Sequence, residues 1–94
     1  MLNCYEKVLE INPNEDAAWF NMGIYYQHKG LYRSAIKCYD NSLKILPDDE
    51  EAWINEANCY LELKNNYMVK FCYKKVLEIN PSNEYAKNRL NSIL

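Results

Sequence analysis

The sequence predicts an all-α protein, an α-solenoid in which antiparallel helix pairs follow one another along the chain. Three observations support this prediction. The 94 residues include only two glycines and three prolines, and the prolines are 34 residues apart, as are the two tryptophans (Pro13, Pro47 and Pro81; Trp19 and Trp53). Within each period the apolar residues recur at the three- and four-residue spacing of one helix face. A single helix pair cannot bury such a face, so the pairs are expected to stack.

The first complete period, residues 16–49, is predicted to form a helical hairpin. Its first helix, within residues 16–29, ends at the turn HKGLY, where Gly30 is the predicted helix stop. Its second helix ends before Pro47, because proline cannot continue a helix. The predicted core face of the hairpin consists of Trp19, Met22, Gly23, Tyr26, Ala35, Ile36, Tyr39, Ser42 and Leu43.

The second complete period, residues 50–83, is predicted to repeat this hairpin. An acidic run opens its first helix, and Asp48 and Glu51 have the Asp-x-x-Glu spacing of a capping box. Residues 1–15 and 84–94 then correspond to the second helix and the first helix of a hairpin, each without its partner. A chain of this length is expected to form one domain, so we predict a single domain over residues 1–94.

Four residues in the second period depart from the pattern of the first. Glu56 replaces an apolar residue of the seam between the two helices, and Lys70 stands at a facing place. Because an isolated buried carboxylate is costly, we predict that these two side chains approach each other or both reach the edge of the seam. Val69 replaces the small alanine of the first period, and Tyr67 stands one residue later than Tyr32 of the first period would predict. These two differences predict that the LKNNY turn is one residue longer than the turn of the first period and that the packing around it is looser.

These positions resemble the tetratricopeptide repeat, whose period is also 34 residues. The resemblance covers essentially the whole chain and implies a right-handed superhelix of helix pairs, A and B, in the order B-A-B-A-B-A. It implies a protein-interaction scaffold, and the residues give no positive evidence for an enzyme. The positions that carry it are Trp19, Met22, Gly23, Tyr26, Ala35, Tyr39 and Pro47 in the first period and Trp53, Ala57, Tyr60, Tyr73 and Pro81 in the second.

The resemblance further implies that a partner peptide or helix lies in a concave groove lined by the A helices. The candidate groove residues combine apolar side chains with amides, which suits the backbone of an extended peptide. Some relatives hold the C-terminal carboxylate of a chaperone tail with a five-residue clamp, but only Asn55 and Arg89 fit it here, so that ligand is not expected. A solvated helix surface is the alternative reading. The candidates are Phe20, Asn21, Ile24, Gln27, Ile54, Asn55, Asn58, Leu61, Asn88 and Arg89.

The two terminal segments are complementary halves of one repeat, which gives an alternative function. The chain is either an excerpt of a longer array, or another surface covers its unpartnered N-terminal helix. In the second case the terminal helices of two copies would pair, making the chain a structural self-assembly module. The residues predicted for this self-association are Leu2, Tyr5, Leu9, Leu90 and Leu94.

Composition argues against several other classes of protein. The net charge of −2 and the lack of a basic stripe give no indication of nucleic-acid binding, and no apolar run is long enough to span a membrane. No phosphate-binding loop or nucleophile motif suggests an enzyme, and no cofactor is implied. Cys4, Cys38 and Cys72 occupy equivalent places too far apart for disulfides, and no C-x-x-C pair suggests a metal site. Four unpaired thiols favour the cytoplasm.

Overall fold

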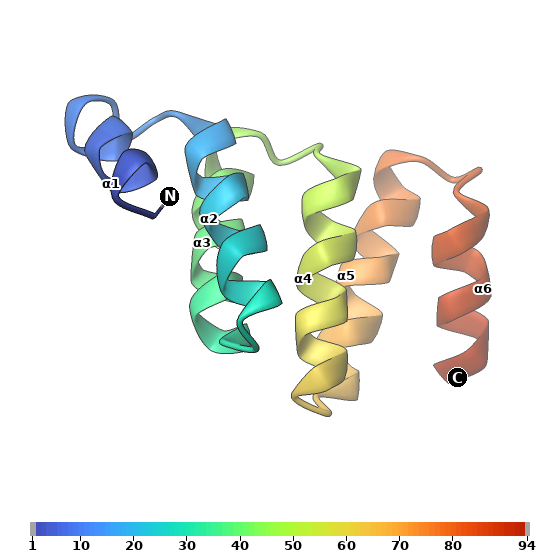
Figure 1. Ribbon diagram of the computed structural model, residues 1–94. Helices are drawn as coiled ribbons and strands as arrows, with labels where there is room; N and C mark the ends of the chain where they lie inside the picture. Colours follow the sequence, from blue (N-terminus) through green and yellow to red (C-terminus); the bar gives the residue numbers. More distant parts are fainter. Residues whose placement is uncertain (1, 94) are drawn as a thin grey trace. The chain divides into compact units, whose positions relative to one another are not determined.

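The computed structural model of the protein describes residues 2–93, and it describes side chains over residues 5–93. This part of the chain contains six α-helices and no strand, so the predicted all-α fold is confirmed (Figure 1). The helices are α1 (Leu2–Ile11), α2 (Asp16–His28), α3 (Tyr32–Ile45), α4 (Glu50–Glu62), α5 (Asn66–Ile79) and α6 (Glu84–Ile93).

The chain divides into two compact units, Met1–Pro47 and Asp48–Leu94. In the first unit α2 and α3 form an antiparallel pair, and α1 packs against α2. In the second unit α4 and α5 form the pair, and α6 packs against α5. Each unit thus holds one complete helical hairpin and one helix without its repeat partner. That the two units form a single domain stays a prediction.

The turns inside the two hairpins have the same length, so the predicted longer LKNNY turn is wrong. Gly30 lies in the first turn and has a left-handed backbone with φ = 76°. Lys64, the residue 34 positions later in the second turn, has the same left-handed conformation with φ = 59°. Helix α5 begins at Asn66, the counterpart of Tyr32 where α3 begins. The displaced Tyr67 therefore reflects a substitution within the helix, and a lysine takes over the backbone geometry that glycine supplies in the first hairpin.

Helix α4 begins as the acidic run predicted, but the capping residue differs. The N-cap is Asp49, whose Oδ1 accepts hydrogen bonds from the backbone N–H groups of Glu51 at 3.2 Å and Ala52 at 3.4 Å. The cap is therefore one residue later than the predicted capping box of Asp48 and Glu51 would place it. A carboxylate at this position satisfies two otherwise unpaired donors and lies at the positive end of the helix dipole.

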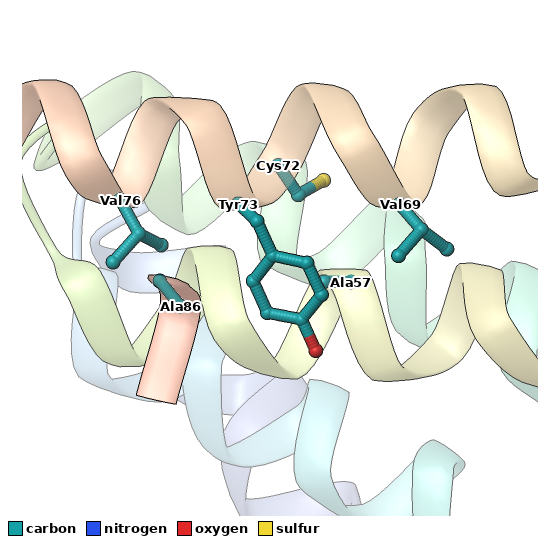
Figure 2. Close-up of a cluster of buried hydrophobic side chains, with 6 residues drawn as sticks. All are labelled: Ala57, Val69, Cys72, Tyr73, Val76 and Ala86. Carbon is teal, nitrogen blue, oxygen red and sulfur yellow. The ribbon is translucent and has the colours of Figure 1, made fainter. Parts of the chain in front are cut away.

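The core of the second unit lies between α5 and its two neighbours. Figure 2 shows side chains of α5 pointing toward Ala57 on α4 and Ala86 on α6. Val69 is fully buried in this cluster, so the looser packing predicted around it is wrong. The cluster consists of Ala57, Val69, Cys72, Tyr73, Val76 and Ala86, and the half-buried Trp53, Ile54, Tyr60, Leu77, Leu90 and Ile93 pack against it.

Glu56 lies inside the seam between α4 and α5. Its side chain is only 2% exposed, and Oε2 accepts a hydrogen bond from the Cys72 Sγ at 3.6 Å. Of the two arrangements predicted for Glu56 and Lys70, the one in which both side chains reach the edge of the seam is therefore wrong, and the approach of the two side chains to each other stays a prediction. A carboxylate is tolerated in a helix seam when polar hydrogens face its oxygens, and the thiol supplies one of them.

Candidate functional site

In the first unit, two of the predicted groove residues on α2 contact the buried Tyr39 of α3. The hydroxyl of Tyr39 donates a hydrogen bond to Oε1 of Gln27 at 2.6 Å. The rings of Phe20 and Tyr39 meet edge to face, with centroids 5.8 Å apart and planes at 60°. On the same helix Asn21 is exposed and Ile24 is half-buried. Tyr39 therefore fixes the positions of two side chains on the candidate binding face of α2.

Gly23 makes the room that Tyr39 occupies. A Cβ atom at Gly23 would lie 2.6 Å from Cε1 and 2.8 Å from Cδ1 of the Tyr39 ring, far inside normal contact distance. Because glycine has no Cβ, the ring lies directly against the backbone of α2, and its hydroxyl reaches Gln27 one turn further along the helix. Gly23 and Tyr39 belong to the predicted core face of the hairpin, and both are buried.

In the second unit, Tyr73 of α5 performs the corresponding task with different partners. Its hydroxyl donates to Oδ1 of Asn58 on α4 at 3.4 Å, and its ring meets that of Tyr85 on α6 edge to face at 6.2 Å. The guanidinium of Arg89 lies 5.3 Å from the centre of the Tyr85 ring, within cation–π range. Two tyrosines therefore connect Asn58 on α4 with Arg89 on α6. Figure 2 shows the Tyr73 ring lying beside Ala57, which stands in the place of Gly23.

Burial makes the Tyr73 hydroxyl harder to deprotonate. Desolvation raises the pKa of its hydroxyl, and the neighbouring Tyr85 raises the pKa further. A tyrosine hydroxyl is protonated at neutral pH in any case, and the raised pKa extends its role as a hydrogen-bond donor to more alkaline pH. The amide of Asn58 must then offer its oxygen to Tyr73, which leaves its two N–H donors for other acceptors.

The remaining predicted groove residues are distributed along α4 and α6 of the second unit. Ile54 is half-buried against the hydrophobic cluster, and Asn55 is also half-buried. Leu61 is 39% exposed, and Asn88 is exposed on α6. This arrangement makes α4 partly apolar and partly polar along the face that carries Asn58.

The two buried tyrosines do more than the packing that their repeat positions predict. Both were assigned to the core, and both are fully buried. The signal that was available is that tyrosine, and not phenylalanine, stands at residues 39 and 73. A buried tyrosine hydroxyl needs a hydrogen-bond partner, and the opposite helix carries Gln27 in one unit and Asn58 in the other.

The residues predicted for self-association have mixed environments. Tyr5 and Leu9 are half-buried on α1, whereas the neighbouring Val8 is 40% exposed and Ile11 is 88% exposed. Leu90 is half-buried on α6 and packs against the cluster of its own unit. The predictions for the Leu2 side chain and for Leu94 lie outside the described residues. Self-association stays a prediction.

The described cysteines are buried and form no disulfide. Burial raises the pKa of Cys38 to about 11, and burial together with Glu56 and Glu62 raises the pKa of Cys59 to about 12. Cys72 is buried and forms no disulfide, while Cys4 lies outside the described side chains. Among the described residues, no three or more His, Cys, Asp and Glu side chains are grouped closely enough to hold a metal ion. In the same part of the chain, no helix has the length and apolar character needed to cross a membrane.

Comparisons with known proteins agree with the architecture of paired helices. Solved structures with the same fold include the first TPR domain of Spaghetti (RPAP3) bound to the HSP90 peptide SRMEEVD, with a TM-score of 0.87 at 22% identity over 98% of this chain and 73% of that one. The first TPR domain of human RPAP3 gives a TM-score of 0.85 at 22% identity over 98% of this chain and 72% of that one. The crystal structure of MamA gives a TM-score of 0.88 at 18% identity, and the match covers 98% of this chain and 54% of the MamA chain. A comparison with curated protein sequences gives no match.

The fold and the faces of its helices define the chain as a helical-repeat protein. The profile described as "Tetratricopeptide repeat" matches residues 17–49 and 50–83. The chain therefore belongs to the tetratricopeptide repeat family, as its sequence pattern predicted. Domains of this family generally mediate protein–protein interaction, and the family is a non-catalytic interaction fold.

Proposed function

We propose that this protein is an interaction module that binds an extended segment of a partner protein on the A-helix face of each unit. In the first unit the face carries Phe20, Asn21, Ile24 and Gln27, and in the second it carries Ile54, Asn55, Asn58, Leu61, Asn88 and Arg89. The observation that supports this most strongly is the shared hydrogen bond from a buried tyrosine to an amide oxygen, Tyr39 to Gln27 and Tyr73 to Asn58.

These hydrogen bonds prepare the two amides for binding. An amide that gives its oxygen to a tyrosine hydroxyl presents N–H donors, and peptide carbonyl groups are the acceptors that an extended segment offers at regular spacing. Holding the amide in place before binding lowers the entropy lost when the partner arrives. The half-buried Phe20, Ile24 and Ile54 supply apolar surface for side chains of the segment.

The partner is expected to differ from the HSP90 peptide in the first RPAP3 structure. That peptide ends in acidic residues and a carboxylate, whereas this chain carries Phe20, Ile24 and Tyr85 at three of the five places where chaperone-tail clamps have polar or basic groups. Only Asn55 and Arg89 match the clamp. We therefore propose a segment with apolar side chains, recognised mainly through its backbone.

Affinity capture followed by titration tests this function. The protein is used to isolate its partner from an extract of the cells that produce it, and the bound segment is then synthesised with a fluorescent label. Each of these amides is proposed to donate a hydrogen bond to the partner, and the loss of that hydrogen bond costs about 0.5–1.5 kcal/mol. Gln27→Ala and Asn58→Ala should therefore each weaken binding by up to about tenfold. Lys37→Ala, on the exposed side of α3, is the matched control and should bind like the unaltered protein.

Two further measurements make the result interpretable. Circular dichroism melts show whether Gln27→Ala and Asn58→Ala keep the fold, and light scattering shows whether the mass in solution is unchanged. If both variants are folded and bind the segment as tightly as the unaltered protein does, the A-helix face is not the binding surface.

A second candidate function is self-assembly through the terminal helices, and the exposure of α1 favours it. Ile11 is 88% exposed and Val8 40% exposed on a helix that has no repeat partner within the described chain. Sedimentation velocity across a concentration series tests the idea, with Ile11→Glu as the disrupting variant and Lys37→Glu as the control. A monomer at high micromolar concentration contradicts it.

We further infer that the protein functions in the cytoplasm without binding nucleic acid. Buried thiols that form no disulfide, at Cys38, Cys59 and Cys72, support a reducing compartment. The net charge of −2 gives no electrostatic attraction to a phosphate backbone. Localisation of the tagged protein in its source cells and a binding assay with labelled RNA and DNA test the two parts separately.

A further inference from the structure

The outer side of α5 carries a shallow pocket in the second unit, separate from the proposed binding face. Its lining residues follow helical spacing, and the volume that they enclose is about 150 Å³. We propose that this pocket binds an acidic segment of a partner protein, with carboxylates at its two lysines and an apolar side chain against its two aromatic rings. The lining residues are Tyr67, Lys70, Phe71 and Lys74.

Phe71, one of the two aromatic residues of the pocket, is exposed but has contacts with two neighbouring side chains. Phe71 is 41% exposed, and its ring meets that of Trp53 on α4 edge to face at 6.1 Å. The ammonium of Lys75 lies 5.5 Å from the centre of the Phe71 ring. Tyr67 is 78% exposed. A space of this volume accepts a group the size of one benzene ring, so a single bulky side chain can enter it.

The charged part of the pocket is incomplete within the chain. Lys70 and Lys74 are four residues apart on one helix face, where like charges repel each other. The adjacent Lys75 has Glu78 as a partner at 3.9 Å, but within residues 5–93 neither Lys70 nor Lys74 forms an ion pair with an acidic side chain. A carboxylate supplied by another molecule would remove the repulsion and complete the site.

The same places on α3 show that the pocket is not a general product of the repeat. The counterparts of the four lining residues, 34 positions earlier, are Arg33, Ile36, Lys37 and Asp40. Ile36 is buried, and Asp40 brings an acidic group to the place that Lys74 occupies. At these places α3 therefore has no aromatic side chain, and an acidic residue, Asp40, stands on the same helix as its two cations, Arg33 and Lys37.

Charge and size favour an acidic peptide over a larger polyanion. The whole chain carries a net charge of −2 with a pI near 5.3, so a nucleic acid or an anionic membrane would be repelled by the rest of the surface. Two lysines beside one side-chain pocket make a small footprint on a single helix. Such a site suits a short motif with acidic residues on both sides of an aromatic residue.

Nuclear magnetic resonance titration of the whole protein with the peptide Ac-EEFEE-NH2 tests the proposal. At low ionic strength, the amide signals that move should map to α5 between Tyr67 and Lys75. Two control peptides, Ac-QQFQQ-NH2 and Ac-EESEE-NH2, should both bind more weakly, because each lacks one of the two features. Added salt should weaken binding of the acidic peptide, since the charges are exposed.

Variants with matched charge changes separate a specific site from general attraction. Lys70→Glu combined with Lys74→Glu should weaken binding by about tenfold or more, because both contacts become repulsive. Lys37→Glu combined with Lys44→Glu makes the same change of charge on α3 and should alter binding by less than about twofold. Tyr67→Ser should weaken binding without affecting the fold, because Tyr67 is largely exposed.

Four results would overturn the proposal. Signal changes on α2, α4 or α6 in place of α5 would assign the peptide to the face described above, and no change up to millimolar peptide would show that the pocket does not bind it. Equal weakening by the two charge-reversed variants would indicate general electrostatic attraction. Tighter binding to phosphatidylserine vesicles than to the peptide would indicate a membrane surface. Asn58→Ala distinguishes the two sites, since it should leave binding at α5 unchanged.

Discussion

Replacement of Gly23 by alanine tests the arrangement that holds Gln27 in place. The new methyl group would lie 2.6 Å from Cε1 of Tyr39, and ordinary contact begins at 3.4 Å, so the ring must shift by the difference. Tyr39 is fully buried, and the shift carries its hydroxyl away from Gln27 and its ring away from Phe20. The substitution therefore acts on the proposed binding face from inside the core.

The expected cost follows from the contacts that are disturbed. Loss of the hydrogen bond costs about 1 kcal/mol, and loss of the edge-to-face contact costs about 0.5–1.5 kcal/mol. Alanine regains about 0.8–1 kcal/mol of helix propensity relative to glycine. The net prediction is that Gly23→Ala lowers the free energy of unfolding by about 1 kcal/mol, equivalent to a fall in melting temperature of about 4–8 °C.

Urea and thermal unfolding followed by circular dichroism measure this effect. Gly30→Ala is a useful comparison, because a Cβ at that residue meets no atom within 4 Å and its cost comes from the backbone alone. Tyr39→Leu in the Gly23→Ala background should recover part of the loss, since a smaller side chain relieves the overlap. A Gly23→Ala variant that is as stable as the original or more so would refute the claim that glycine is needed for Tyr39 to reach Gln27.

Three further predictions concern the turns and the core. Lys64→Gly should raise the free energy of unfolding by about 0.5–1 kcal/mol in urea melts, because lysine is strained at φ = 59°, and an unchanged value would argue against that conformation. Glu50→Ala should lower it by about 1 kcal/mol, because Glu50 Oε1 accepts hydrogen bonds from Asn80 at 3.2 Å and Asn83 at 3.0 Å; a neutral result would show that the turn needs no anchor. The pKa of the Cys59 thiol is about 12 in the folded protein, against an ordinary 9 in the unfolded chain. Because the unfolded thiol loses its proton first, the protonated Cys59 thiol stabilises the folded protein fully below pH 9, and this stabilisation is lost as pH rises toward 12. Cys59→Ala should therefore show a smaller fall in stability between about pH 8 and pH 10.5 than the original protein, and equal falls would contradict the pKa.

The helices and their ends were largely predictable because repetition reinforces each local signal. Gly30 and Pro47 end their helices where the sequence indicates, since one supports a left-handed residue and the other lacks an N–H group. The turn of the second hairpin was predicted wrongly because Lys64 adopts a conformation that lysine disfavours. The repeat period gave the correct length, and the local composition of LKNNY did not.

The candidate site was predictable as a set of places but not as a set of contacts. The family pattern put Gln27 and Asn58 on the A helices, whereas the hydrogen bonds that orient them depend on how far each tyrosine reaches across the seam. That reach differs between the units because Gly23 in one corresponds to Ala57 in the other, and the hydroxyls meet different turns of the partner helix. Periodicity cannot show this, because it records which residues face inward and not where their ends lie.

The most direct test of the proposed function is site-specific photo-crosslinking in an extract of the source cells. A photoreactive amino acid is placed at Asn21 or Leu61, which are exposed on α2 and α4, and at Lys37 on the outer side of α3 as the control. The account predicts that Asn21 and Leu61 crosslink to an extended segment of the same partner protein and that Lys37 does not. Crosslinks to the partner from Lys37, with none from Asn21 or Leu61, would contradict it.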